Sequence, residues 1–121
     1  MYPYENSENT PEERAEDLLS RMSLEEKMGQ VSCYFVSEPG DYRGLAEFPH
    51  GVGEVSALQM RLLETLEECV QMQREVQKKV MESSPHRIPA IFHMEGLCGA
   101  YLQGAASFPS GIGRGSSWDP E

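Results

Sequence analysis

The chain has 121 residues, of which 39% are hydrophobic and 25% are charged, a composition that fits one small soluble domain and disfavours disorder and a collagen-like repeat. Twenty acidic residues against ten basic ones give a net charge of -10 at pH 7. Such a surface repels nucleic-acid phosphates and anionic lipid headgroups, so neither nucleic acid nor a membrane is expected as a partner.

The first predicted elements are two short helices, after a polar, irregular lead-in at residues 1–9. Thr10 has the features of a helix N-cap, because a proline follows it and Glu13 lies three residues on, as in a capping box. Ser23 and Glu26 repeat the pattern and predict a second helix. The apolar residues of the first helix follow helical spacing and are expected to face a core; they are Ala15, Leu18, Leu19 and Met22.

The middle of the chain predicts a loop and then a strand. Residues 31–49 are rich in Ser, Pro, Gly and Asp, which favour turns, and only residues 33–36 indicate a short extended piece. Residues 52–56 are a candidate for a short strand.

A third capping box, formed by Thr65 and Glu68, predicts a longer helix that is stopped near Pro85. Residues 88–93 are a continuous apolar run of strand length, which is typical of a strand buried on both faces in a parallel sheet. The expected order of regular elements is therefore helix, helix, strand, helix, strand.

The C-terminal part of the chain is rich in glycine and predicts loops, since six glycines fall between Gly96 and Gly115. Residues 111–117 resemble a phosphate-binding loop, but they lack the lysine of a P-loop and follow no strand, so no nucleotide site is predicted. Asp119 and Pro120 have the features of a helix start.

Glu95 is a candidate functional residue because it directly follows the predicted strand at residues 88–93. Ligand sites of βα folds gather at the carboxyl ends of strands, yet position alone leaves a functional carboxylate and a solvated loop residue equally open. His93 and Cys98 flank it without a second ligand pair or an orienting group. We therefore predict neither a metal site nor a cysteine nucleophile, and expect both side chains to be buried or half-buried.

The cysteines and the N-terminus indicate a cytoplasmic location. Cys33, Cys69 and Cys98 are odd in number and widely spaced, so they are expected to be free thiols in a reducing compartment. The N-terminal residues lack the basic and apolar regions of a secretory signal. The longest uncharged apolar stretches, residues 28–36 and 88–94, are shorter than the ~20 residues of a membrane-spanning helix.

Four blocks of the chain, taken in order, resemble the beginning of glycoside hydrolase family 3, the β-glucosidase and β-xylosidase group. They are residues 13–30, residues 88–93, residues 95–99, and the segment that runs from residues 107–109 to residues 117–121. The resemblance implies an α/β fold in which residues 10–121 form a truncated N-terminal part of a (β/α)8 TIM barrel, about its first two βα units plus N-terminal helices.

The resemblance also implies an activity, the hydrolysis of terminal β-glycosidic bonds by a retaining mechanism that needs two carboxyl groups. Neither is present in this chain, so it is expected to hold no catalytic residue and to be inactive alone. Glu95 matches the family's acidic residue that binds sugar hydroxyls, although Cys98 stands where the family often has histidine. The implied substrate is a β-linked glucoside or xyloside, with no cofactor and no metal.

A second class of function remains open, a non-catalytic acidic remnant or interaction module. Such a module has no need of a glycine-rich loop after a strand, which favours the hydrolase. A reading frame that continues downstream of Glu121 would favour the hydrolase, and a stop codon there would favour the remnant.

Overall fold

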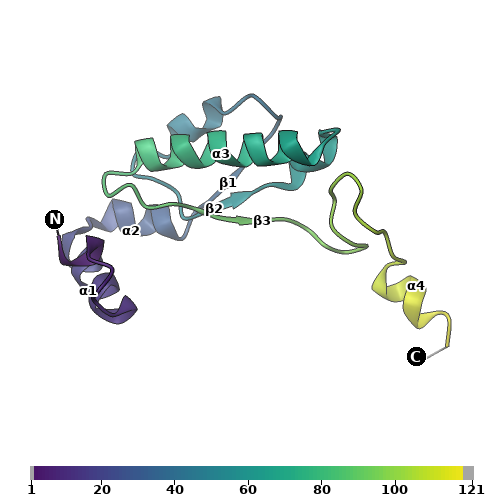
Figure 1. Ribbon diagram of the computed structural model, residues 1–121, viewed down its shortest axis with the longest axis horizontal. Helices are drawn as coiled ribbons and strands as arrows, with labels where there is room; N and C mark the ends of the chain where they lie inside the picture. Colours follow the sequence, from purple (N-terminus) through teal and green to yellow (C-terminus); the bar gives the residue numbers. More distant parts are fainter. Residues whose placement is uncertain (1, 119–121) are drawn as a thin grey trace.

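The computed structural model describes residues 2–118, and Figure 1 shows one long helix lying along three short strands. The prediction of a helix start at Asp119 lies outside the described residues. The elements in chain order are η1 (Pro3–Glu5), α1 (Pro11–Arg21), α2 (Leu24–Gln30), β1 (Cys33–Phe35), η2 (Arg43–Glu47), β2 (Glu54–Ser56), η3 (Leu58–Leu62), α3 (Leu66–Ser83), β3 (Ile91–His93) and α4 (Gly111–Gly115), where η denotes a 3-10 helix.

The three predicted helix starts are confirmed. Thr10, Ser23 and Thr65 are the N-caps of α1, α2 and α3, and each side chain accepts a hydrogen bond from the backbone N–H three residues on. In each case the glutamate at that third position accepts a bond from the N-cap N–H, which completes the capping box. These helices therefore begin where local hydrogen bonding dictates.

Thr65→Ala is expected to lower the free energy of unfolding by about 1 kcal/mol, because the first turn of α3 loses the acceptor of its Glu68 N–H. Urea unfolding followed by circular dichroism measures the change. Thr65→Ser keeps the hydroxyl and should retain most of the stability. Equal losses in the two variants would contradict a role for this cap.

The strands form one parallel sheet in the order β1-β2-β3. Cys33 is level with Glu54 and Ile91 in this sheet, and two residues further along the strands Phe35 is level with Ser56 and His93. The two predicted strands, at residues 52–56 and 88–93, are thus present as β2 and β3, although both are shorter than expected. The segment expected to be a loop with a short extended piece supplies a full strand of the sheet, β1.

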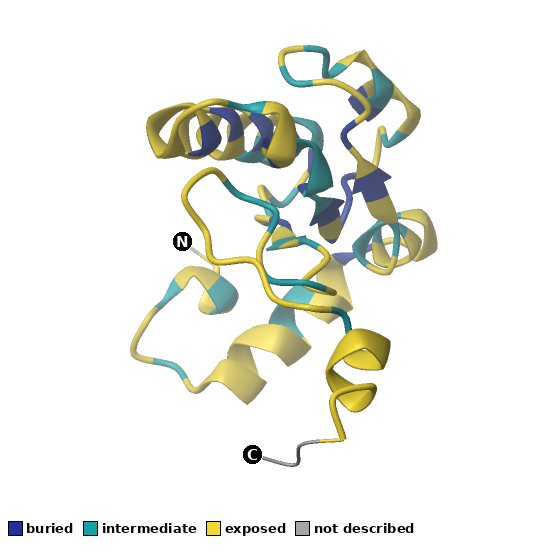
Figure 2. Cartoon of the chain, turned by 90° about the vertical axis from the view of Figure 1, so that its right-hand side faces the viewer, coloured by how far each residue is buried: buried dark blue, intermediate teal, exposed yellow. Residues whose placement is uncertain are grey.

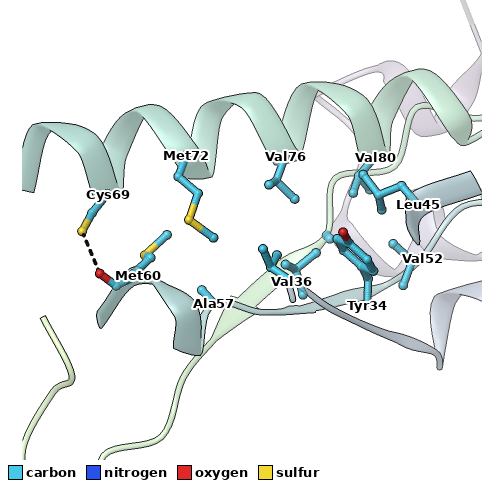
Figure 3. Close-up of a cluster of buried hydrophobic side chains, with 12 residues drawn as sticks. Tyr34, Val36, Leu45, Val52, Ala57, Met60, Cys69, Met72, Val76 and Val80 are labelled. Atoms are coloured by element: carbon cyan, nitrogen blue, oxygen red, sulfur yellow. Dashed lines mark hydrogen bonds between the residues drawn. The ribbon is translucent and has the colours of Figure 1, made fainter. Parts of the chain in front are cut away.

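The hydrophobic core lies between α3 and one face of the sheet, as Figure 3 shows. Cys69 belongs to it, and its thiol donates a hydrogen bond to the Met60 carbonyl at 3.7 Å. Burial raises the pKa of this thiol, which keeps it protonated as a donor. The buried members are Tyr34, Val36, Leu45, Val52, Val55, Ala57, Met60, Cys69, Met72, Val76, Val80 and Ala90.

The predicted truncated TIM barrel is wrong. The described chain is a small α/β domain with a three-stranded parallel sheet and four helices, and it does not repeat a βα unit. Only the 3-10 helix η2 lies between β1 and β2, whereas α3 makes the single helical crossover, between β2 and β3. The sequence pattern of capped helices and an apolar strand is common to both architectures, so it could not distinguish them.

Two burial predictions are also wrong. The predicted stripe on the first helix does not face a core, because α1 has no buried residue and Leu19 is 50% exposed; only Met22, just after the helix, is buried. The strand expected to be covered on both faces has one open face, where Ile91 is 70% exposed. The exposure of the α1 stripe and the open face of β3 both follow from the small size of the sheet, which α3 covers on one side only.

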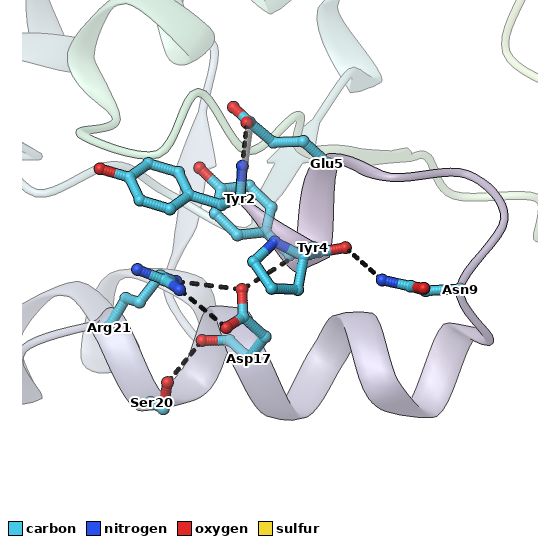
Figure 4. Close-up of polar contacts among 8 residues, drawn as sticks. Tyr2, Tyr4, Glu5, Asn9, Asp17, Ser20 and Arg21 are labelled. Carbon is cyan, nitrogen blue, oxygen red and sulfur yellow. Dashed lines mark hydrogen bonds and ion pairs between the residues drawn. The ribbon is translucent and has the colours of Figure 1, made fainter.

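The N-terminal segment is held against α1 by polar contacts (Figure 4). The backbone N–H of Tyr4 donates to Asp17 at 3.1 Å, and Arg14 donates to the Tyr4 carbonyl at 2.8 Å. Arg21 bonds to both oxygens of Asp17 and lies over the ring of Tyr2, 4.2 Å from its centre. The Arg21 hydrogen bonds lower the pKa of the Asp17 carboxyl, which favours its charged form.

Candidate functional site

One face of the sheet is open to solvent. Side chains alternate along a strand, so Tyr34 and Val55 point toward α3 and are buried. In Figure 2 the buried positions gather between α3 and the strands. The alternate positions form the open face, where only Ser56 is partly buried; its residues are Cys33, Phe35, Glu54, Ser56, Ile91 and His93.

Three polar side chains converge on this open face, one from each strand. The Cys33 Sγ lies 3.4 Å from the His93 Nε2, and that nitrogen lies 3.8 Å from a carboxylate oxygen of Glu54. One sulfur, one oxygen and one nitrogen atom from these residues all lie within 4.8 Å of one another. The thiol is also 3.7 Å from the Tyr34 carbonyl. Exposed side chains from three strands thus share one small volume.

The register of the sheet explains this convergence. Cys33 and His93 stand on the two outer strands and are offset by two residues along them, so their backbones are separated by about 12 Å. Both side chains lean over β2, where Glu54 is the direct neighbour of Cys33. Backbone hydrogen bonds fix the relative positions of the strands. The Ala57 N–H donates to the His93 carbonyl at 2.8 Å, and the Glu54 N–H donates to the Ser32 carbonyl at 3.1 Å.

Sequence reasoning missed this cluster and misjudged His93. The prediction that His93 is buried or half-buried is wrong, because it is exposed, whereas Cys98 is half-buried as predicted. The partners of His93 lie 60 and 39 positions earlier in the chain, not beside it. The apolar run at residues 33–36 was the only signal in the sequence, and it indicates a strand without giving the register that places Cys33 beside His93.

Glu95 lies two residues after the end of β3 and is exposed. The preceding residue, Met94, packs against the core. Within residues 2–118 the Glu95 carboxylate has no hydrogen-bond or ion-pair partner. It is therefore a free anionic acceptor beside the carboxyl edge of the sheet.

The loop that follows Glu95 folds back on itself. The backbone N–H of Phe108 donates to the Cys98 carbonyl at 2.8 Å, which closes the loop. Gly99 adopts a φ of +106°, and a Cβ there would overlap the Ala106 carbonyl, so glycine is required at this crossing. Residues 111–115, part of the segment that resembles a phosphate-binding loop, form the short exposed helix α4.

A shallow hollow of about 380 Å³ lies at the opposite edge of the sheet. Ala15 and Leu18 of α1 line it together with Ile88 and Pro89, which precede β3. The hollow is thus formed by the partly exposed stripe of α1 and lies at the amino end of β3, whereas Glu95 lies past its carboxyl end. Its lining also includes the charged side chains of Glu5, Arg14 and Arg87.

No protein-family model and no curated protein matches this chain. The resemblance to glycoside hydrolase family 3 therefore rests on the four sequence blocks alone.

The cysteines at positions 33, 69 and 98 are free thiols, as predicted. Within residues 2–118, no helix combines the length and the apolar character needed to cross a membrane.

Proposed function

We propose that this chain is part of a protein that hydrolyses β-glycosidic bonds, and that Glu95 binds hydroxyl groups of a β-linked glucoside or xyloside. The observation that carries the proposal is the unpaired Glu95 carboxylate, exposed just past the carboxyl end of a parallel strand. Loops at that end of parallel strands are the usual place of ligand sites. A cytoplasmic location, in keeping with the three free thiols, is part of the proposal.

The chemistry of an ionised carboxylate suits this role. Its two oxygens accept charge-assisted hydrogen bonds from neighbouring sugar hydroxyls and fix the orientation of the ring. Phe35, which is 50% exposed at the end of β1, offers an apolar surface at the same edge of the sheet. The C–H face of a pyranose packs on an exposed aromatic ring of this kind.

The proposal assigns substrate binding to this chain and no bond cleavage. Retaining hydrolysis needs a nucleophile and an acid/base carboxyl about 5 Å apart on either side of the glycosidic bond. The resemblance places neither within residues 1–121. Incubation of the chain with an aryl β-glucoside is therefore expected to release no sugar.

Sugar binding by the 121-residue chain tests the proposal directly. Methyl β-glucoside and methyl β-xyloside, added during amide NMR spectroscopy, are expected to shift resonances around Glu95 with weak, millimolar affinity. Glu95→Gln should weaken that binding at least about tenfold, because hydrogen bonds to a charged group contribute about 1.5–3 kcal/mol.

Glu16→Gln is the matched control. It removes an exposed carboxylate of α1, away from the carboxyl edge of the sheet, and should leave sugar binding unchanged. The proposal fails if neither sugar shifts any resonance near Glu95, or if the two variants weaken binding equally.

An acidic interaction module is the second candidate. The observation in its favour is the apolar surface that α1 and α2 leave uncovered, where Leu19, Leu24 and Met28 are each at least half exposed. A module of this kind gives no sugar response in the same titration, which separates the two functions.

A further inference from the structure

We propose that Cys33, Glu54 and His93 form a binding site for a divalent transition-metal ion, with Zn²⁺ as the best fit, on the open face of the sheet. The site is independent of sugar binding by Glu95.

The donor set matches the preferences of zinc. Zn²⁺ is bound in proteins by cysteine sulfur, histidine nitrogen and carboxylate oxygen, and this cluster supplies one of each. The thiolate and the imidazole disfavour Mg²⁺ and Ca²⁺, which take oxygen ligands. A thiolate and a carboxylate together balance the two positive charges of the ion.

The donor atoms are already near the spacing that the ion requires. Tetrahedral zinc, with bonds of about 2.0–2.3 Å, places its ligand atoms about 3.3–3.6 Å apart. The Cys33 sulfur and the His93 Nε2 are 3.4 Å apart, and the Glu54 oxygen is 3.8 Å from that nitrogen. The Cys33 sulfur and the Glu54 oxygen lie within 4.8 Å of one another, so rotation of the exposed Glu54 side chain has to bring its carboxylate closer to the sulfur.

The surroundings favour a bound cation with an open coordination position. All three residues are exposed, so no protein group covers the fourth position and water can fill it. The net charge of -10 attracts cations to the whole surface. Among residues 2–118 this is the one place where three or more His, Cys, Asp or Glu ligand atoms meet so closely.

Cobalt(II) and zinc titration of the reduced, full 121-residue chain tests the proposal. Co²⁺ is expected to bind one ion per chain, with a thiolate-to-cobalt charge-transfer band and the visible bands of four-coordinate cobalt. Zn²⁺ should displace it and raise the Tm. Cys33→Ser should abolish the charge-transfer band. His93→Ala and Glu54→Gln should each weaken cobalt binding at least about tenfold, because mutation of residues that only hydrogen-bond to metal ligands already lowers metal affinity by about 10- to 100-fold.

Cys98→Ser and His50→Gln are the matched controls, because they remove a thiol and an imidazole outside the cluster. Both should bind cobalt as the unchanged chain does. Circular dichroism checks that each variant is folded, as expected for substitutions on an open face. The proposal is overturned by a chain that binds no cobalt, by one ion per two chains, or by a charge-transfer band that survives Cys33→Ser and disappears in Cys98→Ser.

Discussion

Replacing Gly53 with alanine is expected to destabilise the protein by about 3 kcal/mol or more, which lowers the Tm by roughly 10 °C or more. Gly53 is buried just before β2, where its N–H donates to the Gly29 carbonyl at 2.9 Å and its carbonyl accepts from Ile91 at 2.8 Å. A Cβ there would overlap the Gln30 carbonyl oxygen and lie 2.6 Å from its carbon. These are backbone atoms, so no side-chain rotation relieves the overlap.

Two further alanine variants make this prediction specific. Gly29→Ala should also destabilise, although alanine favours helices, because its Cβ would lie 2.5 Å from the Gly51 carbonyl oxygen. Gly96→Ala is the control, since nothing lies within 4 Å of its Cβ, and it should change stability by less than about 0.5 kcal/mol. Urea unfolding measures all three, and an unchanged Gly53→Ala would contradict the close packing of α2 on β2.

The helix starts could be predicted from the sequence because their causes are local. The caps at Thr10, Ser23 and Thr65 each depend on hydrogen bonds that reach three residues along the chain. The end of α3 is equally local, since Ser84 and Pro85 follow it. A short sequence window contains all of this information.

The sheet depends on contacts that no short window contains. Residues 33–35 form a strand because residues 54–56 pair with them, 21 positions later. The flanking turn formers, among them Ser37 and Pro39, indicated a loop, and they do end the strand after three residues. The fold class was mispredicted for a related reason, because local patterns reveal a strand or helix and do not count the strands of the sheet.

The two candidate sites also differ in how far the sequence predicts them. The place of Glu95 after a strand followed from an apolar run that stops at His93, and its unpaired state is visible only in the structure. The grouping of Cys33 with His93 requires the register of three strands. A one-residue shift of β1 would turn Cys33 toward α3 and dissolve the cluster.

Gln77→Ala is expected to cost about 2–4 kcal/mol, because this side chain replaces a missing strand neighbour at the start of β3. Its amide nitrogen donates to the Ala90 carbonyl at 3.1 Å, and its amide oxygen accepts from the Ala90 N–H at 3.0 Å. Ala90 is 7% exposed, so removal of the amide leaves two backbone groups poorly solvated, at about 1–3 kcal/mol each. The amide thereby fixes the backbone that leads into His93.

Gln77→Glu separates hydrogen bonding from packing, because it keeps the size of the side chain. The introduced carboxylate can still accept from the Ala90 N–H, but it cannot donate to the Ala90 carbonyl and places a charge beside it. The neutral carboxyl can donate, so its folded-state pKa is raised above the unfolded value of about 4.3. The loss of unfolding free energy relative to wild type is therefore present at pH 7 and shrinks as the pH falls through the raised folded-state pKa towards 4.3.

Gln73→Ala is the control; it changes an exposed position one turn earlier on α3 and should change stability by less than about 0.5 kcal/mol. A deficit of Gln77→Glu that does not change with pH, or equal losses at the two glutamines, would show that α3 holds β3 by apolar packing alone.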